Sequence, residues 1–158
     1  MKYSCEIKIS GIVASKELAF FVAPYLKASS LILLSGDLGA GKTTFVRNFL
    51  LSLGYNKSVT SPTFNIVKTY EVGHTFVNHI DAYRLEGRDE EIGLDELIES
   101  DDITFIEWPI YLNPRLLMKE HLDIEIKILN NDERLYVFNS NSKAYESLFI
   151  NLKERYHA

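Results

Sequence analysis

Alternating hydrophobic and polar residues predict strands in five stretches of the chain. The alternation is weak over residues 3–10 and clear over 121–129 and 133–140, which flank a polar Asn-Asn-Asp turn. Residues 64–72 and 75–83 lie on either side of a Gly-His turn. Each of these two pairs is predicted to form a β-hairpin, so part of the sheet is expected to be antiparallel.

Two further stretches are apolar almost throughout. Residues 31–34 have the sequence LILL, and residues 102–108 have the sequence DITFIEW. Unbroken apolar runs are typical of strands that are covered on both faces of a sheet. The second run is more apolar than the strand that ends at Asp81, so it is predicted to lie nearer the centre of the sheet.

Apolar residues at helical spacing predict a first helix within residues 14–29. Leu18 and Val22 share one face, and Ser15 is the predicted N-cap because its hydroxyl can accept a backbone N–H at a helix start. Pro24 argues against an unbroken helix, since an interior proline bends or ends one.

Four later stretches also have a helical pattern. An apolar face over residues 45–53 predicts a helix that stops at Gly54. Short helices are predicted over residues 94–99 and around the proline of 111–120, and an amphipathic helix over residues 142–156. Helices that alternate with buried strands predict one α/β domain with a mixed sheet flanked by helices.

The composition fits a single domain over residues 1–158. The formal net charge is −5, whereas a protein that grips a nucleic-acid backbone unaided usually has a basic face. The one cysteine, Cys5, cannot form an internal disulfide, which is typical of a reducing cytosol. Because there is no signal-peptide pattern and no apolar run of about 18 residues, we expect a cytoplasmic protein that does not cross a membrane.

The strongest chemical signal is GDLGAGKT, from Gly36 to Thr43, which matches G-x-x-x-x-G-K-[ST] at every fixed position. Glycines let the backbone aim its N–H groups at an anion, and the helix that begins near Lys42 adds its positive end. Lys42 brings a charge to the β- and γ-phosphates, and the Thr43 hydroxyl is placed to bind Mg²⁺. The buried strand before this loop and the amphipathic helix after it predict a P-loop NTPase-like fold.

A P-loop needs a carboxylate at the end of a neighbouring strand to help hold Mg²⁺. Asp81 ends one predicted strand and Glu107 ends another. Either carboxylate can serve the metal while the other orients the attacking water, and the sequence leaves this assignment open. Both are candidate catalytic and metal-binding residues, with Lys42 as a third catalytic candidate. The histidines lack metal-ligand spacing, and a structural role is favoured for His79.

The loop TSPTF, residues 60–64, is a candidate for sensing the terminal phosphate. Pro62 stiffens it, and Ser61 and Thr63 supply hydroxyl groups. In switch-type NTPases, a loop of this kind is ordered by the γ-phosphate and Mg²⁺. Ser61 and Thr63 are candidate nucleotide contacts on that ground, although the same residues also suit an ordinary turn.

The chain resembles one family, the bacterial tRNA threonylcarbamoyladenosine biosynthesis ATPases (TsaE, formerly YjeE), in motifs that occur in this order: SGDLGAGKTTFVRNFL, VTSPTFNIVKTY, HIDAYRL, FIEWP and ERLYVF. The segment 110–121 follows no pattern of the family. The resemblance implies an ATP-binding, Mg²⁺-dependent ATPase needed to form N6-threonylcarbamoyladenosine at position 37 of tRNAs that read ANN codons. It also implies TsaB and TsaD as protein partners whose complex is reset by hydrolysis, with only indirect contact to tRNA and none to a membrane.

The resemblance also assigns residues to the site. The phosphate contacts that it implies are Gly36, Gly39, Ala40, Gly41, Lys42, Thr43 and Thr44. It gives Mg²⁺ to Thr43 and Glu107, makes Asp81 the aspartate of H-x-D-x-Y-R-L, and places Trp108 beside the site. Ser15 and Arg134 match positions that approach the nucleotide from the N-terminal segment and from the last hairpin.

Three other functions use the same kind of loop. A small-molecule kinase would transfer the phosphate to an acceptor, but no arginine-rich lid is evident. A GTPase is disfavoured because NKSV, at 56–59, has Val59 where the guanine motif N-K-x-D needs an acid. A nucleotide-gated binding module with incidental hydrolysis stays open, since no arginine is evidently placed to stabilise transition-state charge.

Overall fold

The computed structural model describes residues 2–62, 65–85 and 93–158. The strands in these ranges are β1 (Tyr3–Ser10), β2 (Leu31–Ser35), β3 (Val67–Val72), β4 (Thr75–Asp81), β5 (Ile103–Glu107), β6 (Leu122–Ile128) and β7 (Glu133–Ser140). The α-helices are α1 (Gly11–Val22), α2 (Lys42–Ser52), α3 (Leu94–Ile98) and α4 (Glu146–Tyr156). The short 3-10 turns are η1 (Ala23–Tyr25), η3 (Pro109–Tyr111), η4 (Pro114–Leu117) and η5 (Lys143–Tyr145).

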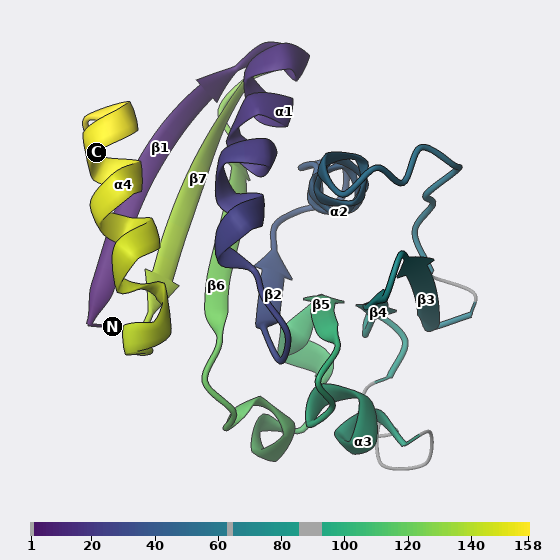
Figure 1. Cartoon of the computed structure of the whole chain (residues 1–158). Coiled ribbons are helices and arrows are strands. Elements are labelled where there is room, and N and C mark those ends of the chain that lie inside the picture. Colours follow the sequence, from purple (N-terminus) through teal and green to yellow (C-terminus); the bar gives the residue numbers. More distant parts are fainter. Residues whose placement is uncertain (1, 63–64, 86–92) are drawn as a thin grey trace.

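Within the described residues, seven strands form one sheet in the order β1-β7-β6-β2-β5-β4-β3 (Figure 1). The strands β6, β2, β5 and β4 run parallel to one another. β7 pairs antiparallel with both β6 and β1, and β3 pairs antiparallel with β4. The predicted α/β domain with a mixed sheet and two hairpins is therefore confirmed, and β5 lies nearer the centre than β4, as expected.

The apolar run of β2 is covered on both faces of the sheet. Ile32 and Leu34 belong to the hydrophobic cluster that also contains residues of α1, α2 and α4. Leu31 and Leu33 belong to a second cluster on the opposite face, which α3 helps to cover. Full burial of a leucine or isoleucine contributes roughly 1.5–3 kcal/mol. β2 is thus held firmly at the point where the glycine-rich loop leaves the sheet.

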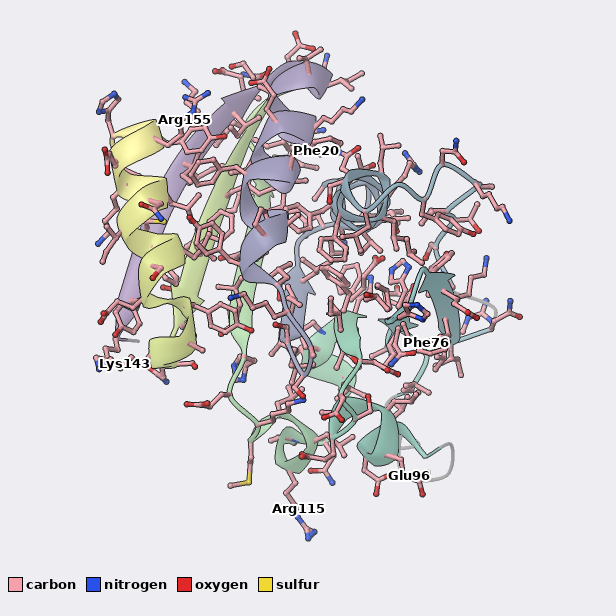
Figure 2. All side chains as sticks on the ribbon, in the orientation of Figure 1. Phe20, Phe76, Glu96, Arg115, Lys143 and Arg155 are labelled. Carbon is pink, nitrogen blue, oxygen red and sulfur yellow. The ribbon has the colours of Figure 1, made fainter. Side chains whose placement is uncertain are left out.

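The helices α1, α2 and α4 cover one face of the sheet (Figure 1), and Figure 2 shows side chains filling the space between them and the strands. The rings of Phe45 and Phe49 on α2 lie 6.4 and 5.0 Å from the ring of Phe105 on β5. At the other end of the sheet, Phe149 of α4 stacks on Tyr3 of β1 at 5.6 Å. Aromatic packing therefore fixes α2, which follows the glycine-rich loop, against the strand that ends in a predicted metal carboxylate.

The predicted N-cap at Ser15 is wrong, because α1 begins four residues earlier, at Gly11. Gly11 has a φ of 86°, and its N–H donates to the carbonyl of Asp132 at 2.9 Å. The turn between β6 and β7 thus satisfies the start of the helix, and the Ser15 hydroxyl instead donates back to the Gly11 carbonyl at 3.1 Å. The objection raised by Pro24 is confirmed, since α1 ends at Val22 and the proline lies in η1.

The predicted helix over 111–120 is also wrong, since the 3-10 turn η3 ends at Tyr111 and the 3-10 turn η4 covers only Pro114–Leu117. Both turns begin at a proline, which lacks an N–H and fits only the first turn of a helix. The other predicted helices are confirmed. α2 ends just before Gly54, which has a φ of 95°, and the last helix starts as η5 and continues as α4.

Two polar residues of β4 are buried, although β4 lies farther from the centre of the sheet than β5. Asn78 and His79 are both 0% exposed. The Asn78 amide donates to Asp102 at 3.1 Å and to Thr104 at 3.3 Å, and it accepts from Thr69 at 2.8 Å. These bonds across three strands satisfy a polar group that the core would otherwise disfavour.

A search of the described ranges for membrane-spanning segments found no helix with the length and apolar character to cross a bilayer.

His121, immediately before β6, lies against a backbone carbonyl and an acidic side chain. Its Nδ1 lies 2.8 Å from the carbonyl oxygen of Lys119, and its Nε2 lies 3.3 Å from a carboxylate oxygen of Asp123. The hydrogen bond to Asp123 raises the pKa of His121 above its ordinary value of 6.5, and partial burial opposes the change.

The protonated imidazole of His121 is expected to stabilise the folded chain. Because the pKa is higher in the folded state, this contribution is complete below pH 6.5 and is lost as the pH rises through the folded-state pKa. Replacing His121 by glutamine should remove a contribution of about 0.5–1 kcal/mol on the acidic side and leave the alkaline side unchanged. Urea denaturation at about pH 5.5 and about pH 8.5 measures the difference. Asp123→Asn should have the same effect, and an unchanged pH dependence in both variants would refute the assignment.

Candidate functional site

The loop from Gly36 to Gly41 joins β2 to α2 and follows a path that favours glycine. Gly39 and Gly41 have φ angles of 80° and 114°, and Gly41 is the N-cap residue of α2. A β-carbon added at either position would meet no heavy atom within 4 Å. Gly39, Gly41 and the first turn of α2 line a cavity, so the positive end of the helix lies beside space that suits an anion.

Gly36 has a different purpose at the start of the loop. Its φ is 148°, and an added β-carbon would lie 2.5 Å from the carbonyl oxygen of Ile126 and 3.1 Å from the β-carbon of Ala40. The backbone of β6 cannot give way at that distance. Because Gly36 has no side chain, the loop can pack directly against the backbone of β6.

Lys42, the first residue of α2, is 5% exposed. Its Nζ donates to the carbonyl oxygens of Gly36 at 2.6 Å and Asp37 at 3.1 Å, and it lies 4.3 Å from the ring centroid of Trp108. Burial lowers the pKa of Lys42 below its ordinary value, and nearby acids, Glu107 first among them, oppose this change. The loop therefore holds a partly desolvated positive charge beside the hollow.

The two predicted carboxylates are brought together by the sheet. β4 and β5 are parallel, and their register places Asp81 directly beside Glu107 at the carboxyl ends of the strands. The two residues are 4% and 3% exposed. Two buried carboxylates side by side favour a cation nearby, because each raises the cost of the other's negative charge.

Glu107 is joined to the loop and to β4 through a single oxygen. Its Oε2 accepts a hydrogen bond from the Thr43 hydroxyl at 2.8 Å. The same Oε2 lies 2.5 Å from Nε2 of His79, whose side chain is wholly buried. The terminal carboxylate of β5 thus contacts Thr43, whose hydroxyl lies in the first turn of α2 and was predicted to bind Mg²⁺.

Asp81 is joined instead to the segment that precedes β3. Its Oδ2 accepts from the hydroxyl of Ser61 at 3.1 Å, and its Oδ1 accepts from the N–H of Tyr83 at 3.0 Å. Its own N–H donates to the carbonyl of Ile66 at 2.8 Å. Ile66 has a φ of 66°, an unfavourable value for a β-branched residue that costs on the order of 1–3 kcal/mol. The backbone is therefore held in a strained form where it supports this carboxylate.

These groups line one cavity of about 460 Å³. The residues around it are Leu38, Gly39, Gly41, Lys42, Thr43, Thr44, Ser61, Asp81, Tyr83, Glu107 and Trp108. Trp108 has a φ of 59° and packs edge-on against Tyr83 at 5.2 Å, and Tyr83 packs against Tyr111 at 5.6 Å. One wall of the cavity is thus aromatic, and the opposite wall is the loop.

The structure brings most of the predicted site residues together around this cavity. Ala40 and Gly36 lie behind the lining, and Arg134 of β7 supports the loop by donating from Nε to the carbonyl of Ala40 at 3.1 Å. Ser15 does not line the cavity and lies on α1, where its hydroxyl donates to the carbonyl of Gly11. Thr63 lies outside the described residues. Contacts of all these residues with a nucleotide stay predictions.

Three residues of the site, Leu38, Tyr83 and His79, were not among the predicted contacts. Tyr83 lines the cavity, and His79 contacts Glu107 from beneath. Tyr83 and His79 both belong to HIDAYRL, and the period of two along a strand places His79 on the same face as Asp81. This alternation along β4 indicates that His79 lies near Asp81, but it does not show which residue of β5 His79 contacts.

The chemistry of the lining fits a nucleotide with a magnesium ion. A search of the described ranges found no cluster of three or more His, Cys, Asp or Glu residues able to hold a metal. Mg²⁺ seldom needs such a cage, because it is usually held by one or two carboxylates together with phosphates and water. Thr43 and Glu107, next to an open anion site, match that requirement.

Comparison with known proteins gives a consistent match. The TsaE family model, described as threonylcarbamoyl adenosine biosynthesis protein TsaE, matches residues 11–136. A protein named tRNA threonylcarbamoyladenosine biosynthesis protein TsaE from Bacillus subtilis is 40% identical over 134 residues, which cover 85% of this chain and 84% of the relative. The protein of the same name from Rickettsia bellii is 40% identical over 124 residues, which cover 77% and 85%.

The fold agrees with a solved structure along almost its whole length. A crystal structure of Bacillus subtilis YdiB superposes with a TM-score of 0.82 and 32% sequence identity, and the match covers 98% of this chain and 97% of that one. The predicted P-loop NTPase-like α/β fold is thereby confirmed. Because the family model spans the glycine-rich loop, both carboxylates and most of the sheet, the chain belongs to the TsaE family.

Proposed function

We propose that this chain is an ATP-binding, Mg²⁺-dependent ATPase that serves the formation of N6-threonylcarbamoyladenosine at position 37 of tRNAs that read ANN codons. In this proposal, hydrolysis resets a complex of the partner proteins TsaB and TsaD and does not carry out the transfer itself. Membership of the TsaE family supports the place in tRNA modification. The observation that carries the ATPase is the single cavity in which Lys42, Thr43, Asp81 and Glu107 meet.

The phosphates are the part of ATP that this cavity suits best. The N–H groups around Gly39 and Gly41 and the positive end of α2 attract negative charge. Within the described part of the chain, Lys42 is the one basic side chain in the cavity lining. Phosphate oxygens can replace the carbonyl groups and the Trp108 ring as partners of its ammonium group.

Thr43 and Glu107 are the residues proposed to hold Mg²⁺. The ion, when bound, would neutralise charge on the β- and γ-phosphates. The Thr43 hydroxyl can direct its oxygen to the ion while it still donates its hydrogen bond to Glu107 Oε2, as the present distance of 2.8 Å allows. Glu107 then serves the ion through its remaining oxygen or through a bound water.

Asp81 is the residue proposed to orient the attacking water. Ser61 and the N–H of Tyr83 each donate to one of its oxygens, so the carboxylate has a fixed orientation. An ionised carboxylate can accept further hydrogen bonds at both oxygens, and one of these can come from water. Placing that water in line with the γ-phosphate is the main task of such a residue in this class of reaction.

The proposal predicts slow hydrolysis by the chain alone and faster hydrolysis with its partners. Arg134 donates from Nε and Nη1 to backbone carbonyls, including that of Ala40. Because it supports the loop in this way, we do not propose it as the arginine that stabilises the transition state. An arginine supplied in trans accelerates related reactions by about 10³ to 10⁵-fold. Phosphate release should be measured for the chain alone, with TsaB and TsaD, and with both proteins and tRNA. Stimulation of about 10³-fold is expected if a partner completes the site in this way.

Equal rates in all three mixtures would contradict a function in resetting the complex. TsaB or TsaD added alone is the matched control, since stimulation should need the assembled complex. A transfer of labelled phosphate to any component other than water would instead indicate a kinase.

A nucleotide-gated binding module is the second candidate, and the bond between Ser61 and Asp81 favours it. This bond links the segment before β3 to the catalytic end of β4, so a bound nucleotide could set the position of that segment. In that case a variant that binds ATP without hydrolysing it would support many rounds of tRNA modification. Under the leading proposal, the same variant supports a single round.

A further inference from the structure

His79 is a wholly buried histidine that contacts Glu107 through one ring nitrogen and has no hydrogen-bond partner for the other among the described residues. It lies on β4 between Val77 and Asp81, at 0% exposure. Nε2 lies 2.5 Å from Oε2 of Glu107, while Nδ1 is buried and has no hydrogen-bond partner among the described residues. A side chain chosen only to fill space in this core would be apolar, because an unpaired buried nitrogen costs free energy.

The contact with Glu107 indicates which ring nitrogen of His79 carries a proton. An ionised carboxylate only accepts hydrogen bonds, so the proton must lie on Nε2 of His79. In the neutral ring, Nδ1 is then an unprotonated acceptor, which is less costly to leave unpaired than a buried N–H donor. The geometry therefore indicates an Nε2–H of His79 that donates to Oε2 of Glu107.

The same contact divides the two oxygens of Glu107. Oε2 receives both hydrogen bonds, from Thr43 at 2.8 Å and from His79 at 2.5 Å. Oε1 has no hydrogen bond within the described part of the chain, and Glu107 lines the cavity. Two donors on one oxygen, from different elements of the fold, hold the carboxylate so that the other oxygen stays available.

We propose that His79 is a positioning residue for the metal site. It holds the Glu107 carboxylate through Oε2, so that Oε1 faces the ion or its bound water while Thr43 keeps its place beside the phosphates. This inference rests on the proposed function, because it assumes that Mg²⁺ accompanies the nucleotide. Groups that orient a metal-binding carboxylate in this way commonly change metal affinity or activity by about 10 to 100-fold when replaced.

Two amide variants distinguish positioning from packing. In His79→Gln, the side-chain amide can reach the place of Nε2 and donate to Glu107. In His79→Asn, the shorter amide reaches only the place of Nδ1, so the donor is lost while the site stays polar. The binding of ADP should be measured by calorimetry with Mg²⁺ and with EDTA, beside ATP hydrolysis at several Mg²⁺ concentrations and the melting temperature.

The wild type should bind ADP more tightly with Mg²⁺ than with EDTA. In His79→Asn, the affinity for ADP with Mg²⁺ should fall by about 10 to 100-fold, while the affinity in EDTA should be unchanged. His79→Gln should restore most of the gain. Equal gains in wild type and His79→Asn would overturn the inference and leave the proposed function intact. No gain in the wild type would overturn both.

A measurement on the wild type avoids any dependence on the stability of the variants. Nitrogen NMR of the histidine ring should show the proton on Nε2 and an unprotonated Nδ1, with slow solvent exchange of the Nε2 proton. A ring with its proton on Nδ1 would overturn the inference, since Nε2 could then not donate to Glu107.

Discussion

Replacing Lys42 by alanine is expected to lower kcat/KM for ATP hydrolysis by about 10² to 10³-fold, the loss typical of removing one charged or preorganised donor from a reacting group. Lys42 Nζ is held by two carbonyl oxygens of the loop at 2.6 and 3.1 Å, so its charge is already placed before a nucleotide arrives. Without it, negative charge that develops on the phosphates would meet only backbone N–H groups. Steady-state phosphate release, with TsaB and TsaD present, measures the loss.

The same variant should fail to support repeated formation of the modified nucleoside. The matched control is Lys127→Ala, which removes an exposed lysine from β6 and should leave both activities unchanged. Melting temperatures would verify that both variants fold. If Lys42→Ala made the modified nucleoside as well as the wild type did, the proposed dependence on ATP would be wrong.

The phosphate loop was predictable because its requirements are local. The spacing from Gly36 to Thr43 depends on backbone conformation and on one helix start, and the flanking strand and helix follow from periodicity within short windows. The carboxylates were also predictable as a pair, since parallel strands bring their carboxyl ends to one edge of the sheet. The register that places Asp81 beside Glu107 was not, because it depends on how two distant strands align.

The features that the sequence did not predict depend on partners far along the chain. The early start of α1 depends on a bond from Gly11 to Asp132 in the last hairpin. The role of His79 depends on an oxygen of Glu107 on the next strand. Each of these features depends on a single long-range polar contact, which neither composition nor period reveals.

The contacts of the two carboxylates predict that their replacement has different effects. Glu107 bonds to the Thr43 hydroxyl, so Glu107→Gln should raise the Mg²⁺ concentration needed for half-maximal activity by about 10 to 100-fold. Asp81 instead accepts hydrogen bonds from Ser61 and from the backbone N–H of Tyr83. Asp81→Asn should therefore leave the Mg²⁺ requirement nearly unchanged and lower kcat by about 10² to 10⁴-fold. Hydrolysis rates over a series of Mg²⁺ concentrations measure both quantities.

The contrast is informative because each substitution keeps the size of the original side chain and at least one of its hydrogen bonds. In Asp81→Asn the new amide oxygen can still accept from Ser61 or Tyr83, and in Glu107→Gln it can still accept from Thr43. A general loss of structure would therefore affect both variants alike. The two acids are joined to different parts of the fold: Glu107 to Thr43 at the start of α2, and Asp81 to the segment before β3. If Asp81→Asn shifted the Mg²⁺ requirement and Glu107→Gln did not, the two roles would have to be exchanged. A similar shift in both would mean that the ion lies between the two acids, as their adjacent positions in the sheet also allow.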